Sequence, residues 1–354
     1  MRGGEKVLLS LLRLFPGAPI FTLLHVKGSV APEIEAREIK TTFVQRLPGV
    51  ERRYRQYLPL FPAAAATLDL RGYEMVISSS HCVAKGVAVD PGAMHICYCH
   101  TPMRYVWDRY DDYFGPGRVG TPAKWILPFV AEGLRAWDVA TAGRVRRYVA
   151  NSRYVAGRIE RYYGREAEVI PPPVDTDFFT PGETNGQAGA FDLVISALAP
   201  YKRLDLVLEA YRGTGRPVKI VGYGPEEPVL RAQAPAEVEI LGKVDDETLR
   251  ELYRRCRAVL MPGVEDFGIV PLEAMACGKP AVAFAEGGAV ETVTPGQTGV
   301  LFHEQTAAAL RAAVDSLSGL RFNTATLRAR AEAHSRPVFE ARFRAFVEDA
   351  LAAG

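Results

Sequence analysis

Two carboxylates at a fixed spacing form the clearest candidate for chemistry in this sequence. The stretch from Glu265 to Glu273 reads Glu-Asp-Phe-Gly-Ile-Val-Pro-Leu-Glu. Because Pro271 suits the first position of a helix, we expect the backbone N–H groups of residues 268–270 to be able to hold a phosphate. Glu265 before that helix and Glu273 in its first turn can each accept hydrogen bonds from vicinal hydroxyls. Alternatively, Glu273 only complements the helix dipole and Glu265 is solvated.

Cations are needed beside such a pair, because two carboxylates repel a diphosphate. Lys202 and Arg203 supply two, shortly after an expected strand at 192–196 and at the start of a helix expected from Leu204. A cation at the N-terminal end of a helix opposes the helix dipole unless an anion lies between them. The pair favours an anion site, with a solvated pair as the alternative.

Glycines mark loops where a ligand can approach the backbone. Gly222 and Gly224 follow an expected strand at 218–221, a place where a nucleotide can come close. Most turns of this kind are only turns. Gly287–Gly288 and Gly3–Gly4 are expected to be similar permissive loops, the latter before the first helix.

Histidine and cysteine alternate along an expected strand at 94–98 and just beyond it. The alternation places His95, Cys97 and Cys99 on one face and His100 on the other, which argues against a four-ligand zinc site and favours buried thiols. His100 stands at the end of the strand, where a catalytic or sugar-binding role and a purely structural role both stay open.

Asp175 and Asp177 imitate an Asp-x-Asp metal motif. They follow Pro171–Pro173 rather than a strand of a sheet, so we expect them to form a turn or a cap. No metal and no other cofactor is expected.

Two segments combine basic and apolar residues. One has Arg46, Arg52, Arg53 and Arg55 ahead of an apolar stretch that ends at 61, and the other is 124–129, Lys-Trp-Ile-Leu-Pro-Phe. Such a surface can dock on anionic lipid, whereas a partly buried helix with a solvated basic face is the alternative.

The elements that must position these residues alternate between short apolar runs and helical patterns, which is typical of parallel α/β architecture. The prolines at 171–173 and the Pro, Gly, Thr and Asn that follow predict a domain boundary. We expect two doubly wound, Rossmann-like domains with ligands bound at the carboxyl ends of their strands, in a cleft between them. The expected parts are 1–172, a linker at 173–190, a second domain at 191–335, and a C-terminal helix at 336–354 that packs back on the first domain.

Composition excludes several classes of protein. The chain has 354 residues, of which 48% are hydrophobic, and this fits two globular domains. Its net charge of +2 is too small to provide the positive potential that general nucleic-acid binding needs. No apolar run reaches the length that a bilayer requires, and the start lacks an apolar signal region. Five cysteines, an odd count, suit a reducing compartment. We expect a cytoplasmic protein, at most in peripheral contact with the inner face of the membrane.

These residues together resemble the retaining glycosyltransferases of family 4, which have the GT-B fold of two facing Rossmann-like domains. The resemblance covers nearly the whole chain, and the Glu-x7-Glu signature is its most specific part. The His-Thr-Pro and Pro-Tyr-Lys-Arg forms are most similar to the mannosyltransferase branch, which uses GDP-mannose to build surface polysaccharides on lipid carriers. The motifs that carry the resemblance lie at 3–7, 97–108, 149–152, 170–179, 196–203 and 265–280.

The resemblance implies roles for the residues of the signature. Glu265 would hold hydroxyls of the donor sugar and Glu273 the ribose of the nucleotide. Gly268, Ile269 and Val270 would offer their amides to the sugar and the diphosphate.

Further roles follow from the resemblance for residues outside the signature. Lys202, helped by Arg203, would neutralise the diphosphate, and His100 would contact the donor sugar near its reacting carbon. Gly4 would let the diphosphate close against the first domain, and Val244 would lie beside the base.

One departure from the family bears on the mechanism. Many members carry Gly-Arg-Leu at a strand end where this chain has Ser-Ala-Leu at 196–198, so stabilisation of the leaving diphosphate would rest on Lys202 and Arg203. The resemblance implies attack from the same face as the leaving group, with the leaving phosphate as base and without a metal.

Two other activities stay open. The same fold can epimerise or hydrolyse a nucleotide-sugar, and it can serve as a non-catalytic partner in a polysaccharide assembly complex. A nicotinamide dehydrogenase fits poorly, because no Gly-x-Gly-x-x-G followed by an acidic residue occurs. The acceptor is expected to be lipid-linked or a glycan.

The beginning of the chain is unusual for this family. Gly3–Gly4 would form the loop after the first strand, yet only Met1 and Arg2 precede it. We therefore expect an upstream segment that contributes an apolar strand.

Overall fold

The computed structural model describes residues 3–115, 121–182 and 189–353. The chain divides into two compact units, one formed by 1–172 together with 339–354 and the other by 173–338. Every ladder in both units is parallel, which is the arrangement expected of βαβ architecture.

The second unit contains a six-stranded sheet. Its strand order is β12-β11-β10-β7-β8-β9, so the chain starts in the middle, moves to one edge, returns and moves to the other. This is the Rossmann order, in which ligands bind beyond the carboxyl ends of the two central strands. The strands are β7 (Asp192–Ile195), β8 (Val218–Val221), β9 (Val238–Gly242), β10 (Val259–Met261), β11 (Ala281–Phe284) and β12 (Gly299–Phe302).

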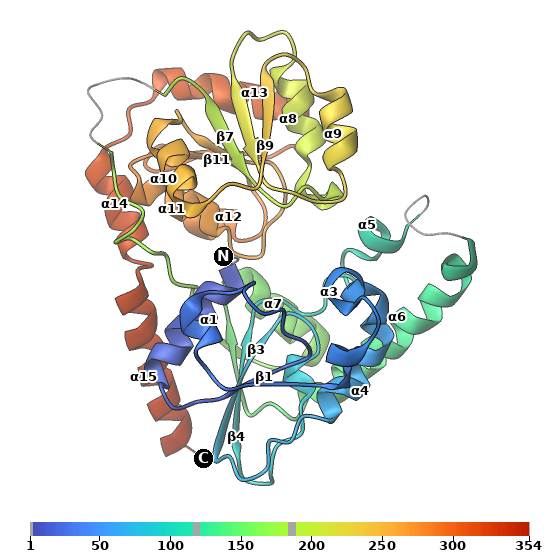
Figure 1. Ribbon diagram of the computed structural model, residues 1–354. Helices are drawn as coiled ribbons and strands as arrows, with labels where there is room; N and C mark the ends of the chain where they lie inside the picture. Colours follow the sequence, from blue (N-terminus) through green and yellow to red (C-terminus); the bar gives the residue numbers. More distant parts are fainter. Residues whose placement is uncertain (1–2, 116–120, 183–188, 354) are drawn as a thin grey trace. The chain divides into compact units, whose positions relative to one another are not determined.

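Helices enclose that sheet, with α8 and α9 on one side of the strands and α10 and α11 on the other (Figure 1). They are α8 (Leu204–Tyr211), α9 (Glu227–Gln233), α10 (Asp246–Arg255), α11 (Ile269–Ala276), α12 (Ala289–Thr292), α13 (Ala307–Ser316) and α14 (Thr324–Glu332).

The segment expected to be a linker belongs largely to the second unit. Val174 and Phe179 are buried in the core of that unit, and the backbone N–H of Val174 donates to the carbonyl of His334. The expectation of a linker across 173–190 is therefore wrong for 173–182, because these apolar side chains bury themselves despite the flanking prolines and glycines. Residues 183–188 lie outside the described part.

The first unit contains a four-stranded sheet in the order β3-β4-β5-β6 and a separate two-stranded sheet of β1 and β2. β4 is buried along its whole length between β3 and β5. The expectation of an upstream strand stays a prediction. The strands are β1 (Ile20–Thr22), β2 (Ile39–Thr41), β3 (Met75–Ser80), β4 (Met94–Cys99), β5 (Arg147–Ala150) and β6 (Ala167–Val169).

The last helix of the chain completes the core of the first unit. α15 (Arg336–Ala352) buries Phe339, Phe343 and Phe346 against α1 and β4. The other helices of this unit are α1 (Gly3–Leu14), α2 (Pro32–Glu35), α3 (Val50–Arg53), α4 (Phe61–Ala66), α5 (Tyr110–Phe114), α6 (Thr121–Ala142) and α7 (Arg153–Tyr163), with short 3-10 turns at 43–46, 54–60 and 84–86.

The expectation of a loop at Gly3–Gly4 is wrong, because α1 already begins at Gly3. The first N–H groups of a helix have no partner inside it, so the first turn tolerates glycine. Among the described residues, no helix has both the length and the apolar character needed to cross a bilayer.

Candidate functional site

The structure brings Lys202 and Glu265 together in the second unit. Lys202 follows β7 and Glu265 follows β10, and these are the two central strands where the strand order reverses. The ammonium and the carboxylate form an ion pair, with the lysine side chain 10% exposed and the glutamate side chain 24% exposed. A small pocket at this place is lined by both residues and by the ends of β7 and β10. The pair therefore lies at the ligand position of the Rossmann topology.

Close backbone contacts hold the loop that contains Glu265. Its carbonyl accepts a hydrogen bond of 2.8 Å from the N–H of Gly288. A Cβ on Gly287 would lie 2.3 Å from the same carbonyl, and one on Gly263 would lie 2.8 Å from the Cα of Lys202. The glycine pair at 287–288, expected to be an open loop, instead packs against the backbone at Glu265.

The amides expected to hold a phosphate lie at the start of α11. Gly268 has the left-handed conformation with φ of 85° and precedes the helix, so Ile269 and Val270 are its first two residues. Pro271 was expected at the first helical position and stands at the third, because the left-handed glycine lets the helix begin earlier. Proline is tolerated there, since N–H groups of the first turn have no acceptor within the helix.

Glu273 lies deeper than Glu265. Only 5% of the residue is exposed, and the hydroxyl of Tyr253 donates a hydrogen bond of 2.7 Å to its Oε2. The sequence reasoning missed Tyr253, because nothing near it in sequence marks it and it meets Glu273 through the packing of α10 on α11.

Arg203 has a strained backbone. Among the described residues it is the only non-glycine residue with positive φ, at 54°, a conformation that costs free energy and is frequent at functional sites. Its guanidinium bonds the carboxylate of Asp205 and, at 3.0 Å, the amide oxygen of Gln305. Its charge is thus already engaged with protein groups.

Gly222 and Gly224 are required by the chain itself rather than left open for a nucleotide. A Cβ on Gly222 would lie 1.8 Å from the carbonyl oxygen of Ser196, and one on Gly224 would lie 2.3 Å from that of Leu198. Val244 lies after β9, partly buried against the core of the second unit. The backbone that comes close to these two glycines is that of the loop after β7.

In the first unit, His100 follows β4 at its carboxyl end. Its Nε2 lies 2.8 Å from the hydroxyl of Ser79, and its ring packs on that of Tyr98 with 5.0 Å between centroids. Removal from water and the nearby charge of His81 lower the pKa of His100 to about 3, so the ring is neutral at physiological pH. A Cβ on Gly4 would meet the ring of His100 at 3.6 Å, which is an ordinary contact.

The loop after His100 is fixed by polar contacts that the sequence reasoning did not single out. The side-chain amide of Asn151 donates to the carbonyl of His100 at 2.9 Å. Arg158 bonds the hydroxyl of Thr101 and the carboxylate of Asp108. These contacts tie residues 100–108 to the start of α7.

The Cys and Asp patterns that imitate metal motifs have other contacts in the structure. Cys97 and Cys99 are buried free thiols that face a different cluster from Tyr98. Asp175 accepts from the N–H of Phe178 and pairs with Arg336, as a turn-forming residue does. Among the described residues, no three His, Cys, Asp or Glu side chains are grouped as metal ligands.

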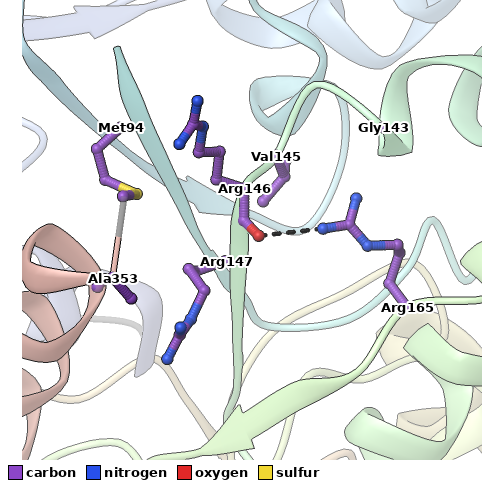
Figure 2. A pocket seen from close by; sticks show the side chains of 8 residues that line it. Met94, Gly143, Val145, Arg146, Arg147, Arg165 and Ala353 are labelled. Atoms are coloured by element: carbon purple, nitrogen blue, oxygen red, sulfur yellow. Dashed lines mark hydrogen bonds between the residues drawn. The ribbon is translucent and has the colours of Figure 1, made fainter. Parts of the chain in front are cut away.

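A pocket at the amino ends of β4 and β5 is lined by Arg146, Arg147 and Arg165 (Figure 2). Arg165 donates to the carbonyl of Arg146 at 3.1 Å, and Arg147 pairs with Asp349 of α15 at 2.7 Å. Figure 2 shows the side chains of Arg146 and Arg147 pointing in opposite directions. Two of the arginines therefore bond to the protein itself, and Arg147 anchors the C-terminal helix.

We use the name apolar–basic surface for the exposed apolar and basic residues of α6 and of the segment 43–60 taken together. Trp125, Ile126 and Phe129 of α6 are 75%, 60% and 81% exposed. The segment 43–60 exposes the four arginines noted in the sequence together with Phe43 and Leu60. Both parts pack against one buried cluster, which includes residues 44, 50, 131 and 134. The side chain of Lys124 lies outside the described ones.

Two family profiles match this chain. "Glycosyltransferase Family 4" matches residues 1–178, and "Glycosyl transferases group 1" matches residues 186–334. The first covers half of the chain and lies in the first unit except for its last six residues, and the second lies in the second unit.

Curated relatives carry several specificities. A D-inositol 3-phosphate glycosyltransferase of Geodermatophilus obscurus is 33% identical over 209 residues, 49% of this chain and 46% of the relative. The D-rhamnosyltransferase WbpZ of Pseudomonas aeruginosa is 31% identical, over 57% and 53%. A GDP-mannose-dependent alpha-(1-6)-phosphatidylinositol monomannoside mannosyltransferase of Mycolicibacterium smegmatis is 33% identical, over 47% and 51%. The matches span about half the length of these relatives.

Solved structures share the fold. HepE of Anabaena in complex with UDP has a TM-score of 0.69 at 16% identity, over 98% of this chain and 96% of that one. Sucrose-phosphate synthase of Thermosynechococcus elongatus has a TM-score of 0.71 at 18% identity, over 99% and 92%. The expected α/β class with two Rossmann-like halves is confirmed, and the fold is GT-B. With a family profile over half of its length and a second over most of the remainder, the chain belongs to glycosyltransferase family 4.

Proposed function

We propose that this protein is a retaining glycosyltransferase that moves a hexose from a nucleotide-sugar to a lipid-linked or glycan acceptor. The observation that carries the proposal is the pairing of Lys202 with Glu265 at the two central strand ends of the second unit. A cation and a carboxylate at this position suit a diphosphate and the hydroxyls of a sugar, respectively.

The reaction follows from where charge develops. The bond between the anomeric carbon and the diphosphate breaks, and the departing diphosphate gains negative charge. Lys202 and the amides at the start of α11 act more strongly on that charge than on the bound donor, and this difference accelerates the reaction. The acceptor oxygen bonds the anomeric carbon on the same face, and its proton passes to the departing phosphate oxygen.

His100 is proposed to contact the donor sugar. Support comes from its neutral ring and from its contact with Ser79, which fixes the ring orientation. A neutral imidazole exchanges hydrogen bonds with hydroxyls without adding a charge beside the reacting carbon.

The proposed donor is GDP-mannose. The Pro-Tyr-Lys-Arg form at 200–203 and the mannosyltransferase among the relatives support mannose. Other relatives are named as a D-rhamnosyltransferase and a D-inositol 3-phosphate glycosyltransferase. The sugar and the acceptor are therefore what the experiment must test.

The test measures nucleotide release from GDP-mannose and from UDP-sugars, with and without a lipid-linked acceptor. Glu265→Ala and Lys202→Ala are expected to lower turnover at least about a hundredfold, the usual cost of removing a group that stabilises transition-state charge. Lys219→Ala is the control, because it breaks a partly exposed ion pair with Glu239 in the same unit. Unchanged turnover in both site variants would overturn this assignment.

Other outcomes of the same assay identify the competing activities. Product formed without any acceptor would indicate epimerisation or hydrolysis of the nucleotide-sugar. Donor binding without turnover, for every acceptor offered, would indicate a non-catalytic partner of a polysaccharide assembly complex.

We also propose that the protein works at the cytoplasmic face of an anionic membrane, where a lipid-linked acceptor is presented. Support comes from the apolar–basic surface, whose tryptophan and phenylalanine can enter the headgroup region while its arginines meet anionic lipid.

Sedimentation with vesicles tests this location. The protein is expected to sediment with vesicles that contain phosphatidylglycerol at low salt, and less at high salt because salt screens the arginines. The double variant Trp125→Ser/Phe129→Ser is expected to remain in solution. The double variant Val290→Ser/Leu351→Ser, with two half-exposed apolar residues elsewhere, is the control. Absence of sedimentation of the unmodified protein at low salt would contradict the proposal.

A further inference from the structure

Tyr253 is a fully buried tyrosine whose hydroxyl has a defined partner. It lies on α10, and its hydroxyl donates to Oε2 of Glu273 on α11 at 2.7 Å. Burial and the neighbouring carboxylate raise the pKa of Tyr253 well above its usual value. The phenol therefore keeps its proton and acts as the donor, with the carboxylate as the acceptor.

The ring of Tyr253 is fixed from its other side as well. Phe179 packs edge-to-face on it, with 5.5 Å between ring centroids and 88° between planes. Arg254, next to it on α10, donates to the carbonyl of Thr180 at 2.8 Å and so holds the segment that carries Phe179. A ring held in this way gives its hydroxyl one position, and the hydrogen bond passes that position on to the carboxylate of Glu273.

We propose that Tyr253 is a positioning residue that orients the Glu273 carboxylate for the two ribose hydroxyls of the donor nucleotide. This inference rests on the proposed function, in which Glu273 accepts from the ribose. A carboxylate that receives two vicinal hydroxyls needs a defined plane, and the hydrogen bond from Tyr253 is a contact that helps to set it.

The test compares ligands that differ only in the ribose hydroxyls. Calorimetry measures the affinity of the protein for GDP and UDP and for their 2′,3′-dideoxy forms. In Tyr253→Phe, the preference for the ribose form is expected to fall about fivefold, which is about 1 kcal/mol, a typical value for one hydrogen bond. Affinity for the dideoxy forms is expected to stay within twofold. In turnover assays, KM for the donor should rise while kcat stays within twofold.

Tyr211→Phe is a matched control. Tyr211 is also a buried tyrosine of the second unit, and its hydroxyl donates to Asp192 at 2.5 Å. Its substitution removes a bond of the same kind, and the ratio of ribose to dideoxy affinity is expected not to change. An equal loss of affinity for both forms in Tyr253→Phe would show a merely structural role and overturn the inference.

Two further variants keep the inference testable. Phe179→Leu loosens the packing on the ring but leaves the hydroxyl in place, so it is expected to lower the ratio of ribose to dideoxy affinity by less than Tyr253→Phe does. It provides the test if Tyr253→Phe folds poorly. In a Glu273→Gln background, Tyr253→Phe is expected to have little further effect on the ratio. Suppose that the wild type prefers the ribose forms and that Tyr253→Phe and Phe179→Leu keep the same ratio of ribose to dideoxy affinity. This result would overturn the role of Tyr253 and leave the proposed function intact. A wild type that binds both forms equally would instead contradict the ribose role of Glu273.

Discussion

At the scale of the residue, Lys202 and Glu265 serve each other before any donor arrives. Their ion pair neutralises two charges that are both largely shielded from water. Truncation of one partner leaves the other charge without this ion pair. Lys202→Ala therefore leaves the Glu265 carboxylate to repel the diphosphate, and Glu265→Ala leaves the Lys202 ammonium to attract it. For this reason the double variant Lys202→Ala/Glu265→Ala is expected to lose less affinity for a nucleoside diphosphate than the sum of the two single losses.

Gly222 provides a prediction about stability. Gly222→Ala is expected to destabilise the second unit by more than about 3 kcal/mol, because the added methyl would overlap the carbonyl oxygen of Ser196, which lies 1.8 Å from the Cβ position. Urea unfolding measures this loss. Gly319→Ala is the control, since no atom lies within 4 Å of its Cβ position. A stability equal to that of the control would contradict the close contact.

Single residues also show why part of the site escapes prediction from sequence. The Glu-x7-Glu spacing and the cations after a strand could be recognised because they are local patterns. Tyr253 carries no such pattern, since its partner stands 20 residues away and only helix packing joins them. Gly222 was recognised as a permissive residue, but whether a ligand or the chain itself comes close to it depends on the loop after β7.

At the scale of the element, β4 and the residue that follows it carry two histidines, His95 and His100, whose charged forms are disfavoured. Burial lowers the pKa of His95 to about 4 and that of His100 to about 3. At a pH between these pKa values and the ordinary histidine pKa of about 6.5, the unfolded chain binds more protons than the folded one. The free energy of unfolding therefore rises with pH from about 4 to about 6.5.

The variant His95→Gln tests this pH dependence. It is expected to lower the slope of the unfolding free energy against pH in that window by up to about 1.4 kcal/mol per pH unit, the value for one proton. Thermal unfolding of the first unit at several pH values provides the measurement. An unaltered slope in His95→Gln would contradict the disfavoured protonation of His95.

Helix α6 is tied to its neighbours by a buried charge. Lys85 and Asp138 form an ion pair of 3.0 Å, each about 1% exposed or less, and Trp107 and Tyr163 both donate to Asp138 at 2.9 Å. This network joins α6, α7 and the loop after β4.

Lys85→Ala is expected to destabilise the first unit by about 3–5 kcal/mol, because it leaves the carboxylate of Asp138 without its cation. Arg71→Ala, which breaks an exposed pair with Asp69, is expected to cost far less than Lys85→Ala, because water screens the exposed pair. Urea unfolding followed by tryptophan fluorescence compares the two. A cost for Lys85→Ala no larger than that of the control would show that the buried pair adds nothing.

Elements were predicted best where sequence patterns are strongest. In the second unit, β8 has the expected bounds and α8 the expected start, because their apolar runs are bounded by proline, glycine or arginine. The start of α11 was misplaced by two residues, because a left-handed glycine can begin a helix ahead of a proline. The loop expected at Gly3–Gly4 is a helix start, since apolar spacing from Val7 onward says little about the turn before it.

At the scale of the whole molecule, the division between the two units does not follow the order of the chain. Residues 339–354 belong to the first unit although 173–338 form the second. We expected the C-terminal helix to pack back on the first domain. Its partners, including β4 and α1, could be identified only from the structure.

Phe343→Ala tests the contribution of this helix. Phe343 is fully buried in the first unit, so the substitution is expected to destabilise that unit by about 3–5 kcal/mol and to leave the second unit unchanged. Calorimetry, in which the two units are expected to give separate transitions, measures both. Leu351→Ala, half-exposed on the same helix, is the control. A shift of the second transition instead would contradict this division.

The place of α15 also orders events on the ribosome. Synthesis runs from the N-terminus, yet the core of the first unit needs Phe339, Phe343 and Phe346, which are made after the entire second unit. Residues 173–338 can therefore fold while the first 172 residues still expose the apolar face that α15 will cover. During that interval the exposed apolar face of the first unit can aggregate, and the core of this unit closes only after the three phenylalanines have been made.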